Sequence, residues 1–222
     1  VVDPHGVGES SPMPYYIQNL AEAEYVVATF MYMRLVGIPA SKISIITTYN
    51  GQKDLITDVI AQRCGWSPLY GTPAKIATTD KFQGQQNDYI LLSLVRTKSV
   101  GHIRDVRRLV VSVSRARLGL YVFCCKALYD HCIELKPTFK QLLRKPDQLQ
   151  LLPDERAPVT RKLGNKPKAA MVSMIGVTQM GALVAQMAAA AEAERAALEG
   201  GEQPDAPPDA LMPEAPPVDD DE

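Results

Sequence analysis

A polar stretch at residues 79–88 carries side chains that could bind a nucleotide or a nucleic-acid backbone. Gly84 lets the main chain approach a ligand closely, and the amides of Gln83 and Gln86 can hydrogen-bond to ribose or phosphate. The hydroxyl of Thr79 could donate to a nucleic-acid phosphate. A polar surface turn containing a glycine would have the same composition, so this stretch alone does not decide between the two interpretations.

Two arginines, Arg115 and Arg117, directly precede an apolar run at residues 118–123. An arginine beside a cleft can stabilise the charge that develops on a transferring γ-phosphoryl group. Arg117 could act in the same way or form a salt bridge with an acidic neighbour. Each arginine taken singly is well explained by a salt bridge, but their combination with the polar stretch indicates phosphate chemistry.

A third polar segment, residues 47–52, follows another apolar run and opens a helix that we expect Asn50 to cap. Backbone amides at a helix N-terminus attract phosphate, and the hydroxyls of Thr47 and Thr48 can add donors. Tyr49 could stack on a base, or it could fill the core at the strand–helix junction. All three segments lie at strand ends of one predicted sheet, and we expect residues 79–88 to leave a carboxyl strand end, where ligands of open α/β sheets bind.

The elements that position these residues follow from the hydrophobic pattern. Apolar runs without alternation predict strands covered on both faces, at residues 42–47, 75–79, 89–95 and 118–124. A helix is predicted from Asn19, with Glu22 as capping-box partner, to about residue 35, where Gly37 stops it. A second helix is predicted at residues 51–63. The alternation of strands and helices predicts a doubly wound α/β fold with a parallel sheet.

Residues 104–116 combine the β-branched content of a strand with apolar residues at helical spacing. We predict a helix, because a continuous strand would place Arg107 and Arg108 on opposite faces of a covered sheet. Two short helices are then expected at residues 127–133 and 137–143.

Composition places further limits on function. Eight of the 25 acidic residues lie in residues 202–222, which contain no basic residue, so residues 1–201 carry a net charge of about +7 from 24 basic residues. This excess suits an anionic partner. The four cysteines have no spacing suited to zinc, and they indicate a reducing compartment, cytosol or nucleus. The sequence shows no signal peptide or membrane-length apolar stretch, and we expect no membrane partner and no metal ligands in this chain.

Composition also suggests how the chain is divided. Residues 1–14 are expected to be a loop or a truncated start, and residues 15–145 to form the α/β domain. Residues 146–167 form a connector, and residues 168–199 an Ala- and Met-rich, weakly packed helix. Residues 200–222 are expected to be a disordered acidic tail.

Three motifs occur in a specific order: T-x-Y-x-G-Q from Thr47, T-x-D-x-F-Q-G-x-x-x-D-Y-I-x-x-S-x-V-R from Thr78, and R-R-L-x-V-x-x-S-R-A-R from Arg107. This order resembles the second RecA-like domain of superfamily-one RNA and DNA helicases, in the group related to the nonsense-decay helicase. The resemblance covers about residues 15–125. The longer run from Gln83 to Arg96 is similar to the intron-binding helicases of the spliceosome.

The resemblance implies a RecA-like domain of the P-loop NTPase type and assigns roles to the candidate residues. Arg115 takes the place of the arginine finger that reaches the γ-phosphate of ATP. Gln83, Gly84, Gln86 and Arg117 would lie at the nucleotide. Gln86 stands where many relatives have Glu, and it keeps hydrogen-bonding capacity without the charge. The RNA backbone would meet residues of the other motifs: Thr47, Thr48, Tyr49 and Thr79.

The resemblance also implies partners that the sequence itself does not contain. The sequence has no Gly-x-x-x-x-Gly-Lys-Ser/Thr loop. This loop and the Mg²⁺ ligands belong to the first RecA-like domain, so the chain alone is expected to be inactive toward ATP. The resemblance implies single-stranded RNA of a pre-mRNA intron and spliceosomal proteins as partners, and a nuclear location. The alternatives are an inert helicase-like scaffold or interaction module, and a related helicase of RNA decay or DNA repair.

Overall fold

The computed structural model describes residues 8–152, 155–159 and 171–199. Its strands are β1 Ser10–Met13, β2 Tyr16–Gln18, β3 Ile43–Thr47, β4 Lys75–Thr78, β5 Asn87–Ser93, β6 Ala116–Phe123, β7 Leu149–Leu151 and β8 Val172–Met174. Its α-helices are α1 Leu20–Leu35, α2 Asn50–Cys64, α3 Val106–Val113, α4 Lys126–Asp130, α5 Lys136–Leu142 and α6 Gly176–Glu199. Its 3-10 segments are η1 Ala40–Lys42, η2 Asp80–Phe82 and η3 Gly101–Arg104. The tail expected at residues 200–222 lies outside the described residues.

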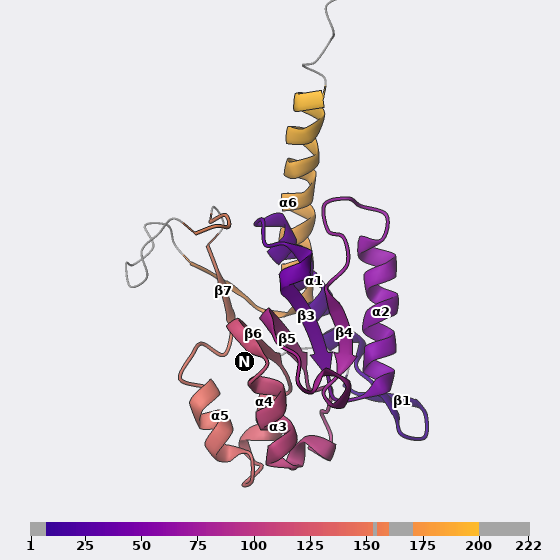
Figure 1. The fold of residues 1–222 in the computed structure, drawn as a ribbon, viewed down its shortest axis with the longest axis vertical. Helices are drawn as coiled ribbons and strands as arrows, with labels where there is room; N and C mark the ends of the chain where they lie inside the picture. Colours follow the sequence, from indigo (N-terminus) through magenta and orange to yellow (C-terminus); the bar gives the residue numbers. More distant parts are fainter. Residues whose placement is uncertain (1–7, 153–154, 160–170, 200–222) are drawn as a thin grey trace, which may run out of the picture.

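A parallel four-stranded sheet in the order β4-β3-β5-β6 forms the centre of the molecule (Figure 1). Its strands are the four that the hydrophobic runs predict. Because parallel strands need crossover connections, α2 lies between β3 and β4 and α3 between β5 and β6, whereas β4 is joined to β5 through the 3-10 segment η2. The predicted α/β class with a RecA-like parallel sheet is confirmed.

Helices cover both faces of this sheet. Side chains alternate in direction along each strand, so neighbouring strand residues belong to different cores. Ile45 and Leu91 belong to the apolar cluster that contains α1 and α2. Ile46, the neighbour of Ile45, belongs to a second cluster with Leu109 of α3 and Phe139 of α5. Two separate cores on opposite faces explain why the strand sequences are apolar throughout rather than alternating.

Within the ambiguous segment at residues 104–116, residues 106–113 form the helix that the argument from its arginines predicts, while Arg104 ends η3 and Ala116 begins β6. α3 begins after Asp105, whose carboxylate accepts a hydrogen bond from the backbone N–H of Arg107 at 3.0 Å. Leu109 and Ser112 are its buried residues. The helix therefore presents Arg107 and Arg108 to solvent on its exposed side.

The cap predictions are partly right. Asn19 caps α1, accepting a hydrogen bond from the N–H of Glu22 at 3.1 Å. The capping box is wrong, because the N–H of Asn19 donates to Gln52 Oε1 at 2.7 Å, leaving the Glu22 carboxylate to bind elsewhere. Asn50 is also wrong as a cap: Tyr49 occupies the N-cap position of α2 without a capping side-chain bond.

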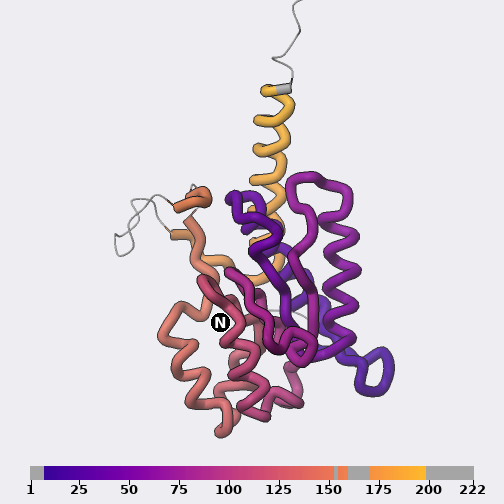
Figure 2. The backbone as a smooth tube through the Cα atoms, in the orientation of Figure 1, coloured from indigo at the N-terminus to yellow at the C-terminus, as the bar shows by residue number. Residues whose placement is uncertain are grey.

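Three regions outside the domain core differ from expectation. Residues 10–18, partly assigned to an initial loop, form the antiparallel hairpin β1–β2, which projects from the body of the domain in Figure 2. The connector contains β7, which pairs with β8. Helix α6 starts at Gly176 and packs on α1 through buried Met180 and Val184, so its first half is not weakly packed. None of the helices in the described ranges is long and apolar enough to span a bilayer.

Candidate functional site

The structure divides the candidate residues between the two opposite ends of the sheet. Thr47 is in register with Thr78 of β4 and Ser93 of β5, so the carboxyl ends of these three strands lie together. Asn87 is in register with Ala116, so the amino ends of β5 and β6 lie together at the other end. Residues 79–86 leave the carboxyl end and cross to the amino end through η2. The three polar segments are therefore divided between the two ends of the sheet.

Arg115 lies at the amino end, immediately before β6. Its guanidinium donates three hydrogen bonds: Nε to the carbonyl of Val111 at 2.9 Å, Nη1 to the carbonyl of Gln85 at 3.3 Å, and Nη2 to Ser114 Oγ at 2.9 Å. All three acceptors are neutral, and no carboxylate of the described residues pairs with it. The side chain is thus held in place while its charge stays available to an anion.

The glutamine segment lies beside Arg115. Gln83, Gly84 and Gln86 are exposed. Gly84 has φ +76°, and a Cβ there would meet nothing within 4 Å, so the backbone conformation rather than crowding favours glycine. Gln85 Oε1 accepts a hydrogen bond from Lys75 Nζ at 2.8 Å. The segment offers free amides next to a fixed guanidinium, a combination that suits a phosphorylated sugar.

Arg117 differs from Arg115 because it has an acidic partner. Its Nη2 lies 2.8 Å from Asp88 Oδ1, and the other oxygen of Asp88 lies 3.4 Å from Lys42 Nζ. Of the two interpretations of Arg117, the structure shows the salt bridge with an acidic neighbour. Two cations share one carboxylate here, so this cluster retains a net positive charge beside the amino end.

At the carboxyl end the threonine hydroxyls are mostly internal. Thr79 Oγ1 donates to the carbonyl of Thr47 at 3.3 Å and lies 3.0 Å from Ser112 Oγ. Thr47 is fully buried, and its hydroxyl has no hydrogen-bond partner among the described residues. Thr48 is half-buried and donates to the carbonyl of Leu94 at 3.3 Å. A small hollow at this end is lined by Thr48, Thr79, Asp80, His102, Ile103 and Arg108.

Tyr49 fills the core of the carboxyl end rather than facing solvent. The residue is 6% exposed, and its ring centroid lies 5.3 Å from that of His102 and 5.7 Å from Arg96 Cζ. Arg96 is in turn paired with Glu9 at 3.1 Å. The structure favours the core role of Tyr49 over base stacking, since both neighbours cover its ring.

Two buried polar residues that sequence reasoning gave no functional role hold the carboxyl end together. The Glu22 carboxylate accepts hydrogen bonds from Ser93 Oγ at 2.6 Å and from the N–H of Val95 at 2.8 Å. Val95 has φ +71°, a left-handed conformation that is strained for a β-branched residue. Gln52 bridges Asn19 and Ser93 through its amide. Gln52 is the last residue of the T-x-Y-x-G-Q motif, and its place in the motif was the signal that could have indicated its role.

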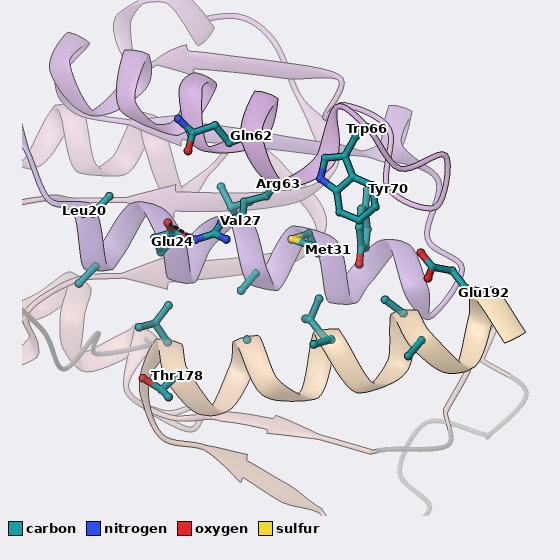
Figure 3. A pocket seen from close by; sticks show the side chains of 18 residues that line it. Leu20, Glu24, Val27, Met31, Gln62, Arg63, Trp66, Tyr70, Thr178 and Glu192 are labelled. Atoms are coloured by element: carbon teal, nitrogen blue, oxygen red, sulfur yellow. Dashed lines mark hydrogen bonds and ion pairs between the residues drawn. The ribbon is translucent and has the colours of Figure 1, made fainter.

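A hollow of about 780 Å³ lies between α1 and α6 (Figure 3). Its lining is mainly apolar, with Trp66 and Tyr70 at one end and the Arg63–Glu24 ion pair, 3.1 Å long, at its rim. The described residues that line it include none of the candidate site residues. Within the described ranges, no cluster of three His, Cys, Asp or Glu side chains could hold a metal ion.

Comparison with known proteins places the chain in a family. The sequence profile of the family described as AAA domain matches residues 5–127, more than half of the chain. The chain belongs to the AAA domain family. Within this family, the chain is 59% identical over 187 residues to the RNA helicase aquarius of Mus musculus, covering 84% of the chain and 13% of that protein.

Two further relatives extend the comparison. The pre-mRNA-splicing factor cwf11 of Schizosaccharomyces pombe is 32% identical over 161 residues, covering 72% of the chain and 12% of that protein. A regulator of nonsense transcripts 1 homolog of Arabidopsis thaliana is 34% identical over 105 residues, covering 46% of the chain and 8% of that protein. The predicted resemblance to this helicase group is confirmed. The chain spans only about an eighth of the length of the first two relatives.

Proposed function

We propose that this AAA domain is the second RecA-like motor domain of an ATP-dependent RNA helicase that acts on pre-mRNA introns in the spliceosome, in the nucleus. The fold supports a motor role, since it is a parallel sheet with helices on both faces. The similarity to aquarius and to the splicing factor cwf11 supports a role in splicing. Spliceosomal proteins and a first RecA-like domain of the same protein are the proposed partners.

The neutral hydrogen-bond partners of the Arg115 guanidinium are the observation that carries this proposal. A fixed, unneutralised arginine can stabilise charge that develops on a γ-phosphoryl group, and it needs no reorganisation to do so. ATP with Mg²⁺ would supply that group, with the Mg²⁺ ligands in the first RecA-like domain. Gln83, Gly84 and Gln86 would contact the nucleotide, and Arg117 would add charge beside it.

RNA would bind at the carboxyl end. Thr48 and Arg108 both line the small hollow, and Arg108, which lies 3.9 Å from Asp80, offers a cation to a phosphate; the Thr48 hydroxyl could donate there in place of its bond to the carbonyl of Leu94. Thr47, Tyr49 and Thr79 would contribute to RNA binding indirectly, by fixing the shape of this end and of the start of α2. Because this end is separate from Arg115, nucleotide and RNA would occupy different surfaces of the domain. Coupling between the two surfaces would then depend on closure of two domains.

The test is the variant Arg115→Ala in the longer protein that also contains a phosphate-binding loop. We expect the rate of ATP hydrolysis to fall by about 10³-fold or more, the effect typical of an arginine finger. RNA affinity should change little. Arg117→Ala is the matched control, because that arginine is already paired with Asp88 and its loss should affect hydrolysis far less. The 222 residues alone should hydrolyse no ATP, since they lack the loop.

The hollow between α1 and α6 favours a second candidate function, that of an interaction module whose nucleotide site is inert. An exposed Trp66 beside an apolar lining is suited to protein contacts. The Arg115→Ala variant separates the two functions. Equal ATP turnover by the variant and the unmodified protein would reject the role of Arg115 in the motor, and no turnover by either would leave the scaffold.

A further inference from the structure

The hairpin β1–β2 ends in a turn whose sequence is unfavourable for its shape. Met13 pairs with Tyr16, so Pro14 and Tyr15 form a two-residue loop. Tyr15 has φ +63°, in the left-handed region. Proline followed by a residue with positive φ is the pattern of a type II turn, in which Gly or Asn is normally the third residue. An aromatic side chain at this position is strained.

Tyr15 also packs against almost nothing among the residues that the structure describes. The residue is 95% exposed, and the neighbouring Met13 is 57% exposed. Burial of an aromatic ring is what usually compensates for a poor backbone fit, and here that compensation is missing. A strained tyrosine that is so exposed suggests a role in binding.

The hairpin is firmly attached to the start of α2, at the carboxyl end of the sheet. Gly51 lies so close to it that a Cβ there would be 2.8 Å from the carbonyl oxygen of Ile17. Tyr16 Oη donates to Asp54 Oδ2 at 2.8 Å, and Gln18 Nε2 donates to the carbonyl of Gly51 at 3.1 Å. The base of the hairpin is therefore fixed, while its tip extends beyond the domain (Figures 1 and 2).

We propose that Tyr15 stacks on a nucleobase of single-stranded RNA bound at the carboxyl end, an inference that rests on the proposed function. A ring held at the tip of an anchored hairpin loses little conformational entropy on binding, and every base offers a flat face to it. The sequence suggests Tyr49 for base stacking, but Tyr49 is buried under Arg96 and His102. Tyr15 supplies at this end the exposed aromatic ring that Tyr49 does not.

The test measures the affinity of the full 222-residue chain for a fluorescein-labelled 20-nucleotide oligouridine by anisotropy. Tyr15→Ala should raise Kd by roughly 5- to 150-fold, the range expected for the loss of one base–aromatic stack. Tyr15→Phe should bind within about twofold of the unmodified chain, since it keeps the ring. Trp66→Ala is the matched control: Trp66 is also exposed, at 72%, but it lines the hollow between α1 and α6.

A second variant separates binding from folding. Tyr15→Gly removes the ring and relieves the left-handed strain, so Tm should stay the same or rise while RNA affinity falls. If Tyr15 were purely structural, Tyr15→Gly would lower both Tm and RNA affinity. A matching abasic oligonucleotide should bind the Tyr15→Ala variant and the unmodified chain equally.

Three results would overturn the proposal. An unchanged Kd for Tyr15→Ala rejects stacking but leaves RNA binding in place, and it directs attention to a protein partner for the hairpin. An equal loss of affinity for the abasic oligonucleotide rejects stacking in favour of a backbone contact. If the unmodified chain itself binds no RNA, the proposed RNA role of the carboxyl end fails, and the stacking role fails with it.

Discussion

At the amino end of the sheet, Arg115 is held by neutral acceptors and has no carboxylate partner among the described residues, whereas at the carboxyl end the hydroxyls of Thr47 and Thr79 are buried. Both ends carry residues of the helicase motifs. The amino end keeps its polar groups available to a ligand, and the carboxyl end uses them mainly to join β3, β4 and α3. Membership of a motif therefore does not tell whether a side chain contacts a ligand or supports the surface that does.

The strongest test of this contrast is the buried carboxylate of the carboxyl end. Glu22→Ala would leave Ser93 Oγ and the N–H of Val95 without their acceptor in a buried site. We expect the free energy of unfolding to fall by about 3 kcal/mol, measured by urea denaturation. Glu24→Ala on the same helix is the control, because Glu24 forms only a surface pair with Arg63 and should cost less than about 1 kcal/mol. Equal losses of stability in the two variants would mean that the buried Glu22 carboxylate does not stabilise the carboxyl end.

A smaller effect sharpens the comparison between the two ends directly. Thr79→Val removes the buried hydroxyl bonds to Thr47 and Ser112 and should lower the free energy of unfolding by about 1 to 2 kcal/mol. Thr57→Val is the control, since Thr57 makes a similar bond, to the carbonyl of Lys53, on the exposed side of α2; we expect a change below about 0.5 kcal/mol.

A substitution at the amino end should cost less stability than Thr79→Val. Arg115→Ala should lower the free energy of unfolding by less than about 1 kcal/mol, because its bonds reach half-exposed backbone groups that water can satisfy. A larger loss for Arg115→Ala than for Thr79→Val would show that Arg115 is chiefly structural, and the contrast between the ends would fail.

The smallest effect concerns pH and contrasts Arg115 with a paired arginine. Arg104 of η3 lies 2.6 Å from Glu134, and the hydrogen bond from its side chain is the main cause that lowers the pKa of Glu134 from 4.5 to about 2. Because the folded-state pKa is lowered, this pair stabilises the fold above about pH 4.5, and the contribution is lost as pH falls toward 2.

Unfolding of the unmodified chain and of Glu134→Gln should therefore be followed over this pH range. We expect the difference in stability between them to shrink as the pH falls. A difference that stays constant would mean that the pair does not couple to protonation. Arg115 has no carboxylate among the described residues, so Arg115→Ala should show no comparable dependence.

The sequence was sufficient where the signal is local. Continuous apolar runs located β3, β4, β5 and β6, because strands covered on both faces need no alternation. Helix α3 could be predicted because its arginines are incompatible with a covered strand. The cap at Asn19 followed from a short-range hydrogen bond.

The remaining features depend on contacts distant in sequence. Glu22 follows Asn19 at capping-box spacing, but Gln52, 33 residues away, takes the N–H that the box would use. The packing of α6 on α1 joins residues more than 140 positions apart, so helical periodicity alone could not reveal it. The direction in which residues 79–86 cross the sheet follows only from strand order. Tyr15 gave no signal, because its positive φ is unusual for its residue type.

The central claim is that Arg115 acts on the transition state of ATP hydrolysis. Its most direct test compares two ligands in the longer protein that contains both RecA-like domains: a non-hydrolysable ATP analogue, and ADP with aluminium fluoride as a transition-state mimic. Arg115→Ala should lower affinity for the mimic by about 10²-fold or more, with affinity for the ATP analogue changed little, because an arginine finger binds the transition state selectively. Equal affinities of the variant and the unmodified protein for the mimic would contradict the account.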